Sequence, residues 1–314
     1  MSKIYIYHHN DHDGIIAAGV LYNHLSERRK QQVIFNMIDY NVELNFDHIN
    51  FGNCDEVYFL DYSFSSKHNQ EEFKKLLERR IDGDDVVWID HHKTSIGLFD
   101  DYNITGIRNT ALCGAAWTYL WCNDLMNSYY NLSKEEASNK FHDCEGGIPV
   151  FLKYIDDYDC WKKMYMATND FHYGLILSDP RDLIIERLLD KNIDGAFLYM
   201  EYQVIIEQGK QIQAYLNFEN KEYHIDMYGF EYTLPEEHGG LKCFCLNRKG
   251  NSIMFGDKIK EYDVVIPFYY NNGKWTYSIY SIKEDIDCSE VAKTYGGGGH
   301  KGAAGFTISE FIFK

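Results

Sequence analysis

Several features are scarce in this sequence, and each shortage excludes a class of protein. No run of about 18 apolar residues is present, so no transmembrane helix is expected. Proline is rare, with 4 residues in 314, and 45% of the chain is hydrophobic, which excludes an intrinsically disordered protein. The 8 cysteines follow no disulfide-framework spacing and no signal peptide is recognisable, so we expect reduced thiols and a cytoplasmic location.

Basic residues are also scarce relative to acidic ones. The chain has 31 Lys and Arg against 48 Asp and Glu, a formal charge of −17. This balance argues against a protein that wraps a long nucleic-acid duplex on a basic face. A short anionic ligand is still compatible with the charge if bound divalent cations reverse the local field.

The first half of the chain alternates strand and helix patterns. Apolar runs predict strands at 4–7, 33–35, 55–60 and 86–89, and helical patterns lie at 15–25 and 70–80. This rhythm predicts a parallel sheet with helices on both faces. Further helices are expected at 111–127 and 133–157, the second with Ser133 as N-cap and Glu136 three residues later.

The second half has a different texture. Helical patterns at 183–189 and 197–216 predict a connecting segment, and short strand-like runs follow at 223–227, 242–246, 252–255, 263–268 and 275–282. Asn272-Gly273 predicts a hairpin turn, and 289–295 a helix. At 314 residues the chain can form two domains, which we place at 1–190 and 221–314. The linker is 191–220, and the C-terminal domain is expected to be a smaller, mixed α+β fold.

Three of the predicted strands end in side chains that can bind metal. The first leads into His8, His9, Asp11 and Asp13, the third into Asp61, and the fourth into Asp90-His91-His92. The carboxyl ends of parallel strands meet at one edge of a sheet, where ligands bind. A fourth acidic group, Asp156-Asp157-Tyr158-Asp159, ends a predicted helix.

Together these groups could hold two metal ions about 3.5–4 Å apart, bridged by a carboxylate from the middle strand. Such a pair acidifies a water and clamps both oxygens in a phosphoryl displacement. Carboxylates suit Mn²⁺ or Mg²⁺, and the imidazoles favour Mn²⁺. Taken singly, three of the groups have a plainer interpretation, because Asp11, Asp13 or Asp61 could cap a helix and the fourth group could be an acidic helix end. Asp90-His91-His92 is harder to explain in this way, because adjacent histidines are rarely a packing choice.

A glycine-rich tract near the C-terminus is the second chemical element. It runs from 296 to 305, and its backbone N–H groups, with His300 and Lys301, predict an anion-binding loop. It follows a helix and lacks the Gly-Lys-Ser/Thr ending of a Walker loop. A flexible turn is the alternative interpretation.

These motifs together resemble the DHH phosphoesterase superfamily. His9-x-Asp11-x-Asp13-Gly14, Asp61, Asp90-His91-His92 and Asp157-Tyr-Asp159-x-Trp161 are similar to motifs I to IV, and 298–305 is similar to the GGHxxAAG motif of the DHHA1 domain. The resemblance spans residues 8 to 305. It implies a two-domain, Mn²⁺-dependent phosphoesterase of the group that includes nanoRNases, RecJ-like exonucleases and cyclic-dinucleotide phosphodiesterases.

The resemblance also implies roles for individual residues. One metal ion would take His9, Asp11 and Asp61, and the second would take Asp13, Asp61, His91 and Asp157. His92 would face the scissile phosphate, and Asp90 would support the histidines. The substrate-binding residues would be Gly298, Gly299, His300 and Lys301, with Tyr280 beside them.

The chain departs from the family pattern at three places. The usual motif I histidine position holds Tyr7, which leaves His8 and His9 as candidates. In motif IV, Asp156 and Asp159 compete with Asp157, which we favour for its distance from Trp161. Tyr280 stands where nanoRNase-like members have an arginine, so an Arg fork for a terminal phosphate is missing.

The leading hypothesis is therefore an enzyme that hydrolyses phosphodiester bonds of short oligonucleotides or dinucleotides with two Mn²⁺ ions, Mg²⁺ being possible. The alternatives are a phosphatase acting on a small nucleotide of the pAp kind or on polyphosphate, and a non-enzymatic nucleotide-binding regulatory module. The module would have lost metal ligands, whereas every motif here retains a candidate. A homodimer is compatible with the sequence, and no membrane partner is expected.

Overall fold

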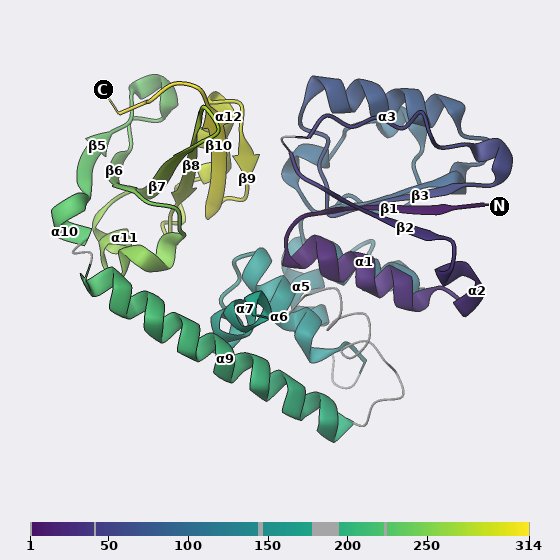
Figure 1. Cartoon of the computed structure of the whole chain (residues 1–314), viewed down its shortest axis with the longest axis horizontal. Helices are drawn as coiled ribbons and strands as arrows, with labels where there is room; N and C mark the ends of the chain where they lie inside the picture. Colours follow the sequence, from purple (N-terminus) through teal and green to yellow (C-terminus); the bar gives the residue numbers. More distant parts are fainter. Residues whose placement is uncertain (1, 41, 144–146, 178–194, 223–224, 314) are drawn as a thin grey trace. The chain divides into compact units, whose positions relative to one another are not determined.

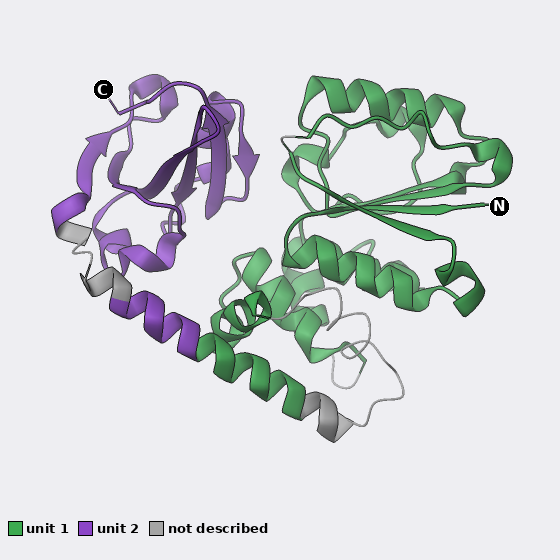
Figure 2. Ribbon diagram, in the orientation of Figure 1, with its two compact units in different colours: residues 1–210 green, residues 211–314 purple. Residues whose placement is uncertain are grey.

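The structure is a computed structural model, and it describes residues 2–40, 42–143, 147–177, 195–222 and 225–313. The chain separates into two compact units, residues 1–210 and 211–314 (Figure 2). The division falls inside helix α9 (Gly195–Glu222), which corresponds to the second of the two linker patterns. The first pattern, at 183–189, lies outside the described residues. Each helix in the described ranges is too short or too polar to serve as a transmembrane segment.

Unit 1 is built on a four-stranded parallel sheet, as the sequence predicted. Its strands are β1 (Ile4–His9), β2 (Val33–Ile38), β3 (Glu56–Leu60) and β4 (Val86–Ile89), in the order β2-β1-β3-β4. β1 therefore pairs with β2 on one side and with β3 on the other. The strand order reverses at this point, which is where open α/β sheets bind their ligands.

Helices cover both faces of this sheet (Figure 1). Successive side chains of β1 point to opposite faces, so Ile4 and Ile6 enter one core while Tyr5 and Tyr7 enter the other. The first core contains α1 (His12–His24), α4 (Gly114–Cys122) and α6 (Val150–Asp159), and the second contains α3 (Lys67–Arg79). The predicted helix at 70–80 corresponds to α3, and its apolar stripe of Phe73, Leu76 and Leu77 is buried.

The expected single helix at 133–157 is wrong. Two helices lie there, α5 (Lys134–Asp143) and α6. Pro149 directly precedes α6, and a proline has no N–H to continue a helix. The predicted capping box is confirmed, because Ser133 Oγ accepts from Glu136 N at 3.2 Å and Glu136 Oε2 accepts from Ser133 N at 2.8 Å. Unit 1 also contains α2 (Glu27–Lys30) and α7 (Thr168–Ile176).

Unit 2 contains a six-stranded mixed sheet. Its strands are β5 (Phe230–Thr233), β6 (Lys242–Asn247), β7 (Val264–Asn271), β8 (Lys274–Tyr280), β9 (Gly298–Gly299) and β10 (Ala303–Ile308), in the order β5-β6-β7-β8-β10-β9. β6 and β7 are parallel, and the other pairs are antiparallel. The predicted hairpin turn is confirmed, with Asn272 and Gly273 at positive φ of 47° and 81°. The helices of unit 2 include α10 (Ile225–Tyr228), α11 (Lys258–Glu261) and α12 (Cys288–Thr294).

Two of the predicted strands of unit 2 are wrong, and one strand was missed. The run at 223–227 overlaps α10, and residues 252–255 form a 3₁₀ helix in which Asn251 Oδ1 accepts from Ile253 N at 3.1 Å. The strand at 230–233 was not predicted. An apolar run of four residues does not distinguish a strand from one helical turn, so these errors fall on the shortest elements.

Candidate metal centre

His9, Asp11 and Asp13 lie where β1 ends and α1 begins. Asp11 is the N-cap of α1, and its Oδ1 accepts from Gly14 N at 2.9 Å. Its Oδ2 lies 2.6 Å from His9 Nδ1, so one carboxylate both caps the helix and reaches the histidine. The helix-cap and metal-ligand interpretations of Asp11 are therefore compatible. His8 points elsewhere, with Nδ1 at 2.9 Å from His9 O, and only 3% of its surface is exposed.

Gly14 is required by a close approach and not by a sharp turn. A Cβ at this position would lie 2.4 Å from the backbone oxygen of His9. The first turn of α1 is thus pressed onto the end of β1. Any side chain at 14 would push the helix away from the strand and separate Asp13 from His9.

Asp13 is anchored at the N-terminus of α4. Its two oxygens accept from Gly114 N at 2.7 Å and from Ala115 N at 2.8 Å. A helix N-terminus stabilises a carboxylate through its free N–H groups and dipole. Asp13 is 2% exposed, and its Oδ2 also lies 3.5 Å from His91 Nε2.

Asp61 occupies the middle of the centre. It follows β3 with a positive φ of 55°, in the left-handed region that few residues other than glycine, asparagine and aspartate adopt. It is 1% exposed, and within the described part of the chain neither carboxylate oxygen has a hydrogen-bond partner. Its Oδ1 lies 3.1 Å from His91 Nε2 and its Oδ2 lies 3.8 Å from His9 Nδ1. Asp61 therefore stands between the two histidines with its oxygens uncommitted.

Asp90, His91 and His92 follow β4, and their side chains have different surroundings. His91 is 1% exposed, and its Nε2 faces Asp61 and Asp13. His92 turns its Nδ1 to Asp90 Oδ1 at 2.8 Å. Asp90 is fully buried, and Ser95 Oγ donates to its other oxygen. Asp90 therefore holds His92 directly, which matches part of its expected supporting role.

The three aspartates of α6 also differ. Asp156 is fully buried and accepts from Lys162 Nζ at 2.5 Å, with His142 Nε2 at 2.7 Å. Asp159 Oδ2 lies 3.2 Å from His91 Nε2. Asp156 is thus committed to an internal ion pair, whereas Asp159 reaches the centre.

Asp157, the residue favoured from the sequence, is engaged elsewhere. Its carboxylate accepts from Met164 N at 2.6 Å and from Tyr165 N at 3.2 Å, and Thr168 Oγ1 donates to it as well. It belongs to none of the metal-capable groups found among the described residues. The geometry gives no support to Asp157 as a ligand, because its oxygens hold the loop that follows α6.

The carboxylates of the centre repel one another. Burial, followed by the charge of Asp11, raises the pKa of Asp13 to about 6. Burial and the charge of Asp13 likewise raise the pKa of Asp61 and of Asp159 well above the usual range. A bound cation would reverse these shifts and stabilise all three charges.

Within unit 1, three of the metal-capable groups among the described residues share Asp61. One contains His9, Asp11 and Asp61, a second contains Asp13, Asp61 and His91, and a third contains Asp61, Asp90 and His92. In each group the ligand atoms lie within 4.8 Å of one another. Asp159 extends the second group through His91. Cys160 lies in the same group as His91 and Asp159, but burial raises the pKa of its thiol well above the usual range. The carboxylate oxygens and imidazoles that make up the other groups fit Mn²⁺ or Mg²⁺ better than a structural zinc site.

One residue of the centre was missed from the sequence. Tyr40 follows β2, and its hydroxyl lies 3.2 Å from His92 Nε2. Its ring packs on that of His9, with centroids 4.8 Å apart. Its position just past a predicted parallel strand was the available signal, because the residues after β2 reach the same edge of the sheet as those after β1 and β3.

The residues expected to bind substrate lie in unit 2. The glycine tract forms the hairpin of β9 and β10, in which His300 N donates to Ala303 O at 2.7 Å. Ala303 pairs with Tyr280 of β8, so Tyr280 adjoins the hairpin that carries Gly298 and Gly299. The tract therefore forms part of the edge of the sheet through β9 and β10.

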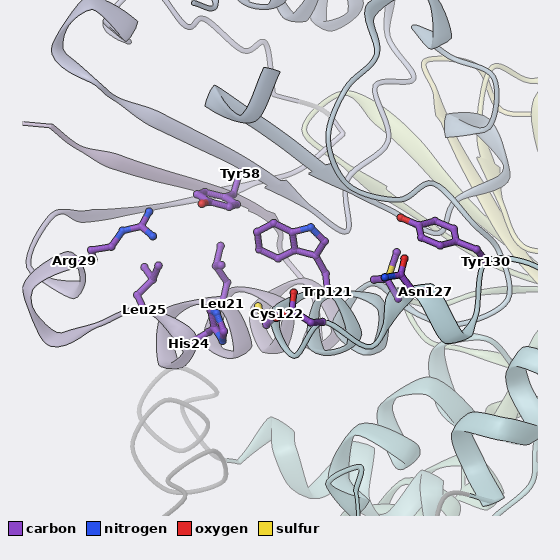
Figure 3. Close-up of a pocket in the computed structure, with 11 residues that line it drawn as sticks. Leu21, His24, Leu25, Arg29, Tyr58, Trp121, Cys122, Asn127 and Tyr130 are labelled. Atoms are coloured by element: carbon purple, nitrogen blue, oxygen red, sulfur yellow. The ribbon is translucent and has the colours of Figure 1, made fainter. Parts of the chain in front are cut away.

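A cavity of about 370 Å³ lies elsewhere in unit 1, between the C-terminal ends of α1 and α4 (Figure 3). Tyr58 of β3 and Trp121 of α4 contact each other at its wall, with centroids 6.1 Å apart. Its lining, within the described ranges, includes none of the predicted site residues. The metal-capable centre and this cavity are thus separate features.

Comparison with known proteins identifies the N-terminal part of the chain. The sequence model for the DHH family, N-terminal domain, matches residues 3–144. The chain is also 23% identical over 333 aligned positions to oligoribonuclease NrnB of Bacillus subtilis (strain 168). The alignment covers 99% of this chain and 74% of that protein.

Two solved structures share the fold. The DHH domain of a member of the s1p family of ribosomal proteins has a TM-score of 0.58 at 15% identity and covers 97% of this chain and 82% of that one. RecJ of Thermus thermophilus in complex with Mn²⁺ has a TM-score of 0.50 at 17% identity and covers 99% of this chain and 50% of that one. Residues 3–144 therefore match the N-terminal domain of the DHH family, and the sequence and the fold agree with the resemblance drawn from the motifs.

Proposed function

We propose that this protein is a Mn²⁺-dependent phosphodiesterase that hydrolyses short oligonucleotides or dinucleotides with two metal ions. The observation that carries the proposal is that the group of His9, Asp11 and Asp61 and the group of Asp13, Asp61 and His91 have Asp61 in common. A bridging carboxylate with two free oxygens between two histidines is the arrangement that a two-ion phosphoester hydrolase needs.

The proposed ligands follow from the distances. His9, Asp11 and Asp61 hold the first ion, and Asp13, Asp61 and His91 hold the second. Asp159 completes the second set in place of Asp157, because Asp159 lies 3.2 Å from His91. The two histidines in the set favour Mn²⁺ over Mg²⁺.

When bound, two such ions acidify a shared water and polarise the phosphoryl oxygens of the substrate. The chain supplies the rest of the chemistry. Asp90 holds the His92 imidazole through Nδ1, and Tyr40 Oη lies 3.2 Å from its Nε2. His92 Nδ1 lies 3.9 Å from Asp61 Oδ1, so we assign His92 the contact with the scissile phosphate.

A small substrate fits the charge of the chain. A net charge of −17 opposes binding of a long polyanion, whereas the bound cations attract a short one locally. The similarity to an oligoribonuclease supports the same choice. In unit 2, we assign substrate binding to Gly298, Gly299, His300, Lys301 and Tyr280 because they gather at one hairpin and its neighbouring strand.

The test is a substrate panel with metal-stripped protein. Mn²⁺ and Mg²⁺ are each titrated against pApA, short RNA and DNA oligomers, cyclic dinucleotides, pAp and polyphosphate. We expect Mn²⁺-dependent cleavage of pApA and short RNA, abolished in Asp61→Ala. Activity confined to pAp or polyphosphate would replace the proposal with a phosphatase, and no hydrolysis of any substrate would contradict it.

A further inference from the structure

Tyr40 lies against the metal-capable centre without belonging to any of the family motifs. It follows β2, the edge strand, and approaches His92 from a position 52 residues away in the chain. Its ring is tilted against His9 and lies edge-on to His92, with centroids 4.8 Å and 6.0 Å apart. It therefore contacts a proposed ligand and the proposed phosphate contact at once.

The hydrogen bonds around His92 fix the direction in which Tyr40 donates. A carboxylate accepts only, so Asp90 Oδ1, at 2.8 Å, takes the proton of His92 Nδ1. In the neutral imidazole the other nitrogen then carries a lone pair. Tyr40 Oη, at 3.2 Å from Nε2, is the donor to that lone pair. The ring of His92 is thus held at both nitrogens by two different residues.

Tyr40 is itself held firmly. Its ring stacks on that of Tyr62, with centroids 5.3 Å apart and planes 16° from parallel. Asn69 of α3 donates to Tyr62 Oη at 3.1 Å and to Val42 O at 3.0 Å, and it accepts from Leu44 N at 2.9 Å. One buried amide therefore fixes both the segment that follows Tyr40 and the ring beneath it.

We propose that Tyr40 is a positioning residue for catalysis: with Asp90 it sets the tautomer and the orientation of His92. This inference rests on the proposed function, because it gives His92 its role at the phosphate. Nothing in motifs I to IV or in the glycine tract includes Tyr40. The hydroxyl acts through the imidazole, and its loss removes one contact that orients the ring.

The first test compares two phenylalanine substitutions that remove the same kind of bond. Tyr7 Oη lies 3.1 Å from His48 Nε2 in the core on the α3 side, so Tyr7→Phe is the matched control for Tyr40→Phe. Phenylalanine retains the aromatic ring, and therefore its packing, at each of the two positions. We expect Tyr40→Phe to lower kcat for pApA by roughly five- to tenfold, the factor that one neutral hydrogen bond is worth, with KM within about twofold. Tyr7→Phe should leave both constants within about twofold.

Equal losses in the two variants, or an unchanged kcat in Tyr40→Phe, would overturn the positioning role. A second measurement does not need activity. In metal-free protein with ¹⁵N-labelled histidine, Tyr40→Phe should shift the Nε2 resonance of His92, and Tyr7→Phe should shift only that of His48. If the protein hydrolyses none of the panel, the proposed function fails, and the resonance of His92 still decides whether Tyr40 donates to it. An unmoved His92 Nε2 resonance in Tyr40→Phe would overturn the inference.

Discussion

Replacing Asp157 or Asp159 by asparagine makes the same chemical change at two positions of α6, and the structure predicts opposite consequences. The Asp157 carboxylate accepts from two backbone N–H groups and from the Thr168 hydroxyl. Asparagine keeps only one acceptor oxygen, so at least one buried donor loses its partner. Each such loss costs about 1–3 kcal/mol. We expect Asp157→Asn to lower the free energy of unfolding by about 2–3 kcal/mol and to leave Mn²⁺ affinity within about threefold.

Asp159 should behave in the reverse way. Burial and the charge of Asp13 raise the pKa of its carboxyl, so its ionised form destabilises the metal-free protein at neutral pH. Asp159→Asn removes that charge, and the metal-free variant should be at least as stable as the wild type. It also removes a proposed ligand. Because changes to residues that merely support a ligand already cost about 10–100-fold in metal affinity, we expect Mn²⁺ affinity to fall by more than about 100-fold.

The assay has two parts. Urea denaturation in EDTA measures stability without metal, and calorimetric titration with Mn²⁺ measures affinity. Loss of Mn²⁺ binding in Asp157→Asn at unchanged stability, with wild-type binding in Asp159→Asn, would contradict the assignment of Asp159 as the ligand. That result would identify Asp157, the residue favoured from the sequence, as the metal ligand of motif IV.

Three further predictions concern the framework around the centre. Gly14→Ala places a Cβ 2.4 Å from His9 O and should lower the free energy of unfolding in urea by about 3 kcal/mol. Gly83→Ala, whose Cβ would have no atom within 4 Å, should change it little. Equal losses in the two variants would contradict the close approach at Gly14. Mn²⁺ at about 100 times its Kd should stabilise the protein by about 2.7 kcal/mol per site and raise Tm by about 5–10 °C, an effect that should vanish in Asp61→Ala. Burial alone would raise the pKa of Asp156, but hydrogen bonding to His142 and the charge of Lys162 hold it below its usual range. The stabilising contribution of the Asp156 carboxylate is therefore complete above about pH 5 and is lost as the pH falls through its folded-state pKa. Asp156→Asn should flatten the acid side of the curve of unfolding free energy against pH, measured in EDTA. An unchanged acid side would contradict this assignment.

The sequence predicted the parallel sheet and the edge at which the centre lies, because both depend on local patterns. Apolar runs ending in Asp61 and in Asp90-His91-His92 require no long-range information to be recognised as strand ends. Parallel strands then bring those ends together. The roles of the ligands, by contrast, depended on the family resemblance.

The aspartate of motif IV could not be chosen from composition alone. Residues two apart on a helix point in different directions, so only one of Asp157 and Asp159 faces the centre. Helical spacing did offer a signal, since Leu152, Ile155 and Asp159 recur at intervals of three and four residues. The distance to Trp161 was a weaker criterion than this stripe.

Tyr40 was missed for a different reason. Its contact with His92 spans 52 residues, and no motif marks it. Its hydroxyl reaches the centre only because Asn69 and Tyr62 fix the chain after β2. Such a contact depends on tertiary packing, which periodicity does not encode.

Anomalous X-ray scattering from crystals soaked in Mn²⁺ would show whether Asp61 bridges two ions. We expect two manganese peaks about 3.5–4 Å apart, both in contact with Asp61 and one of them with Asp159. A single peak, or two peaks without a shared Asp61 oxygen, would contradict the bridging role of Asp61.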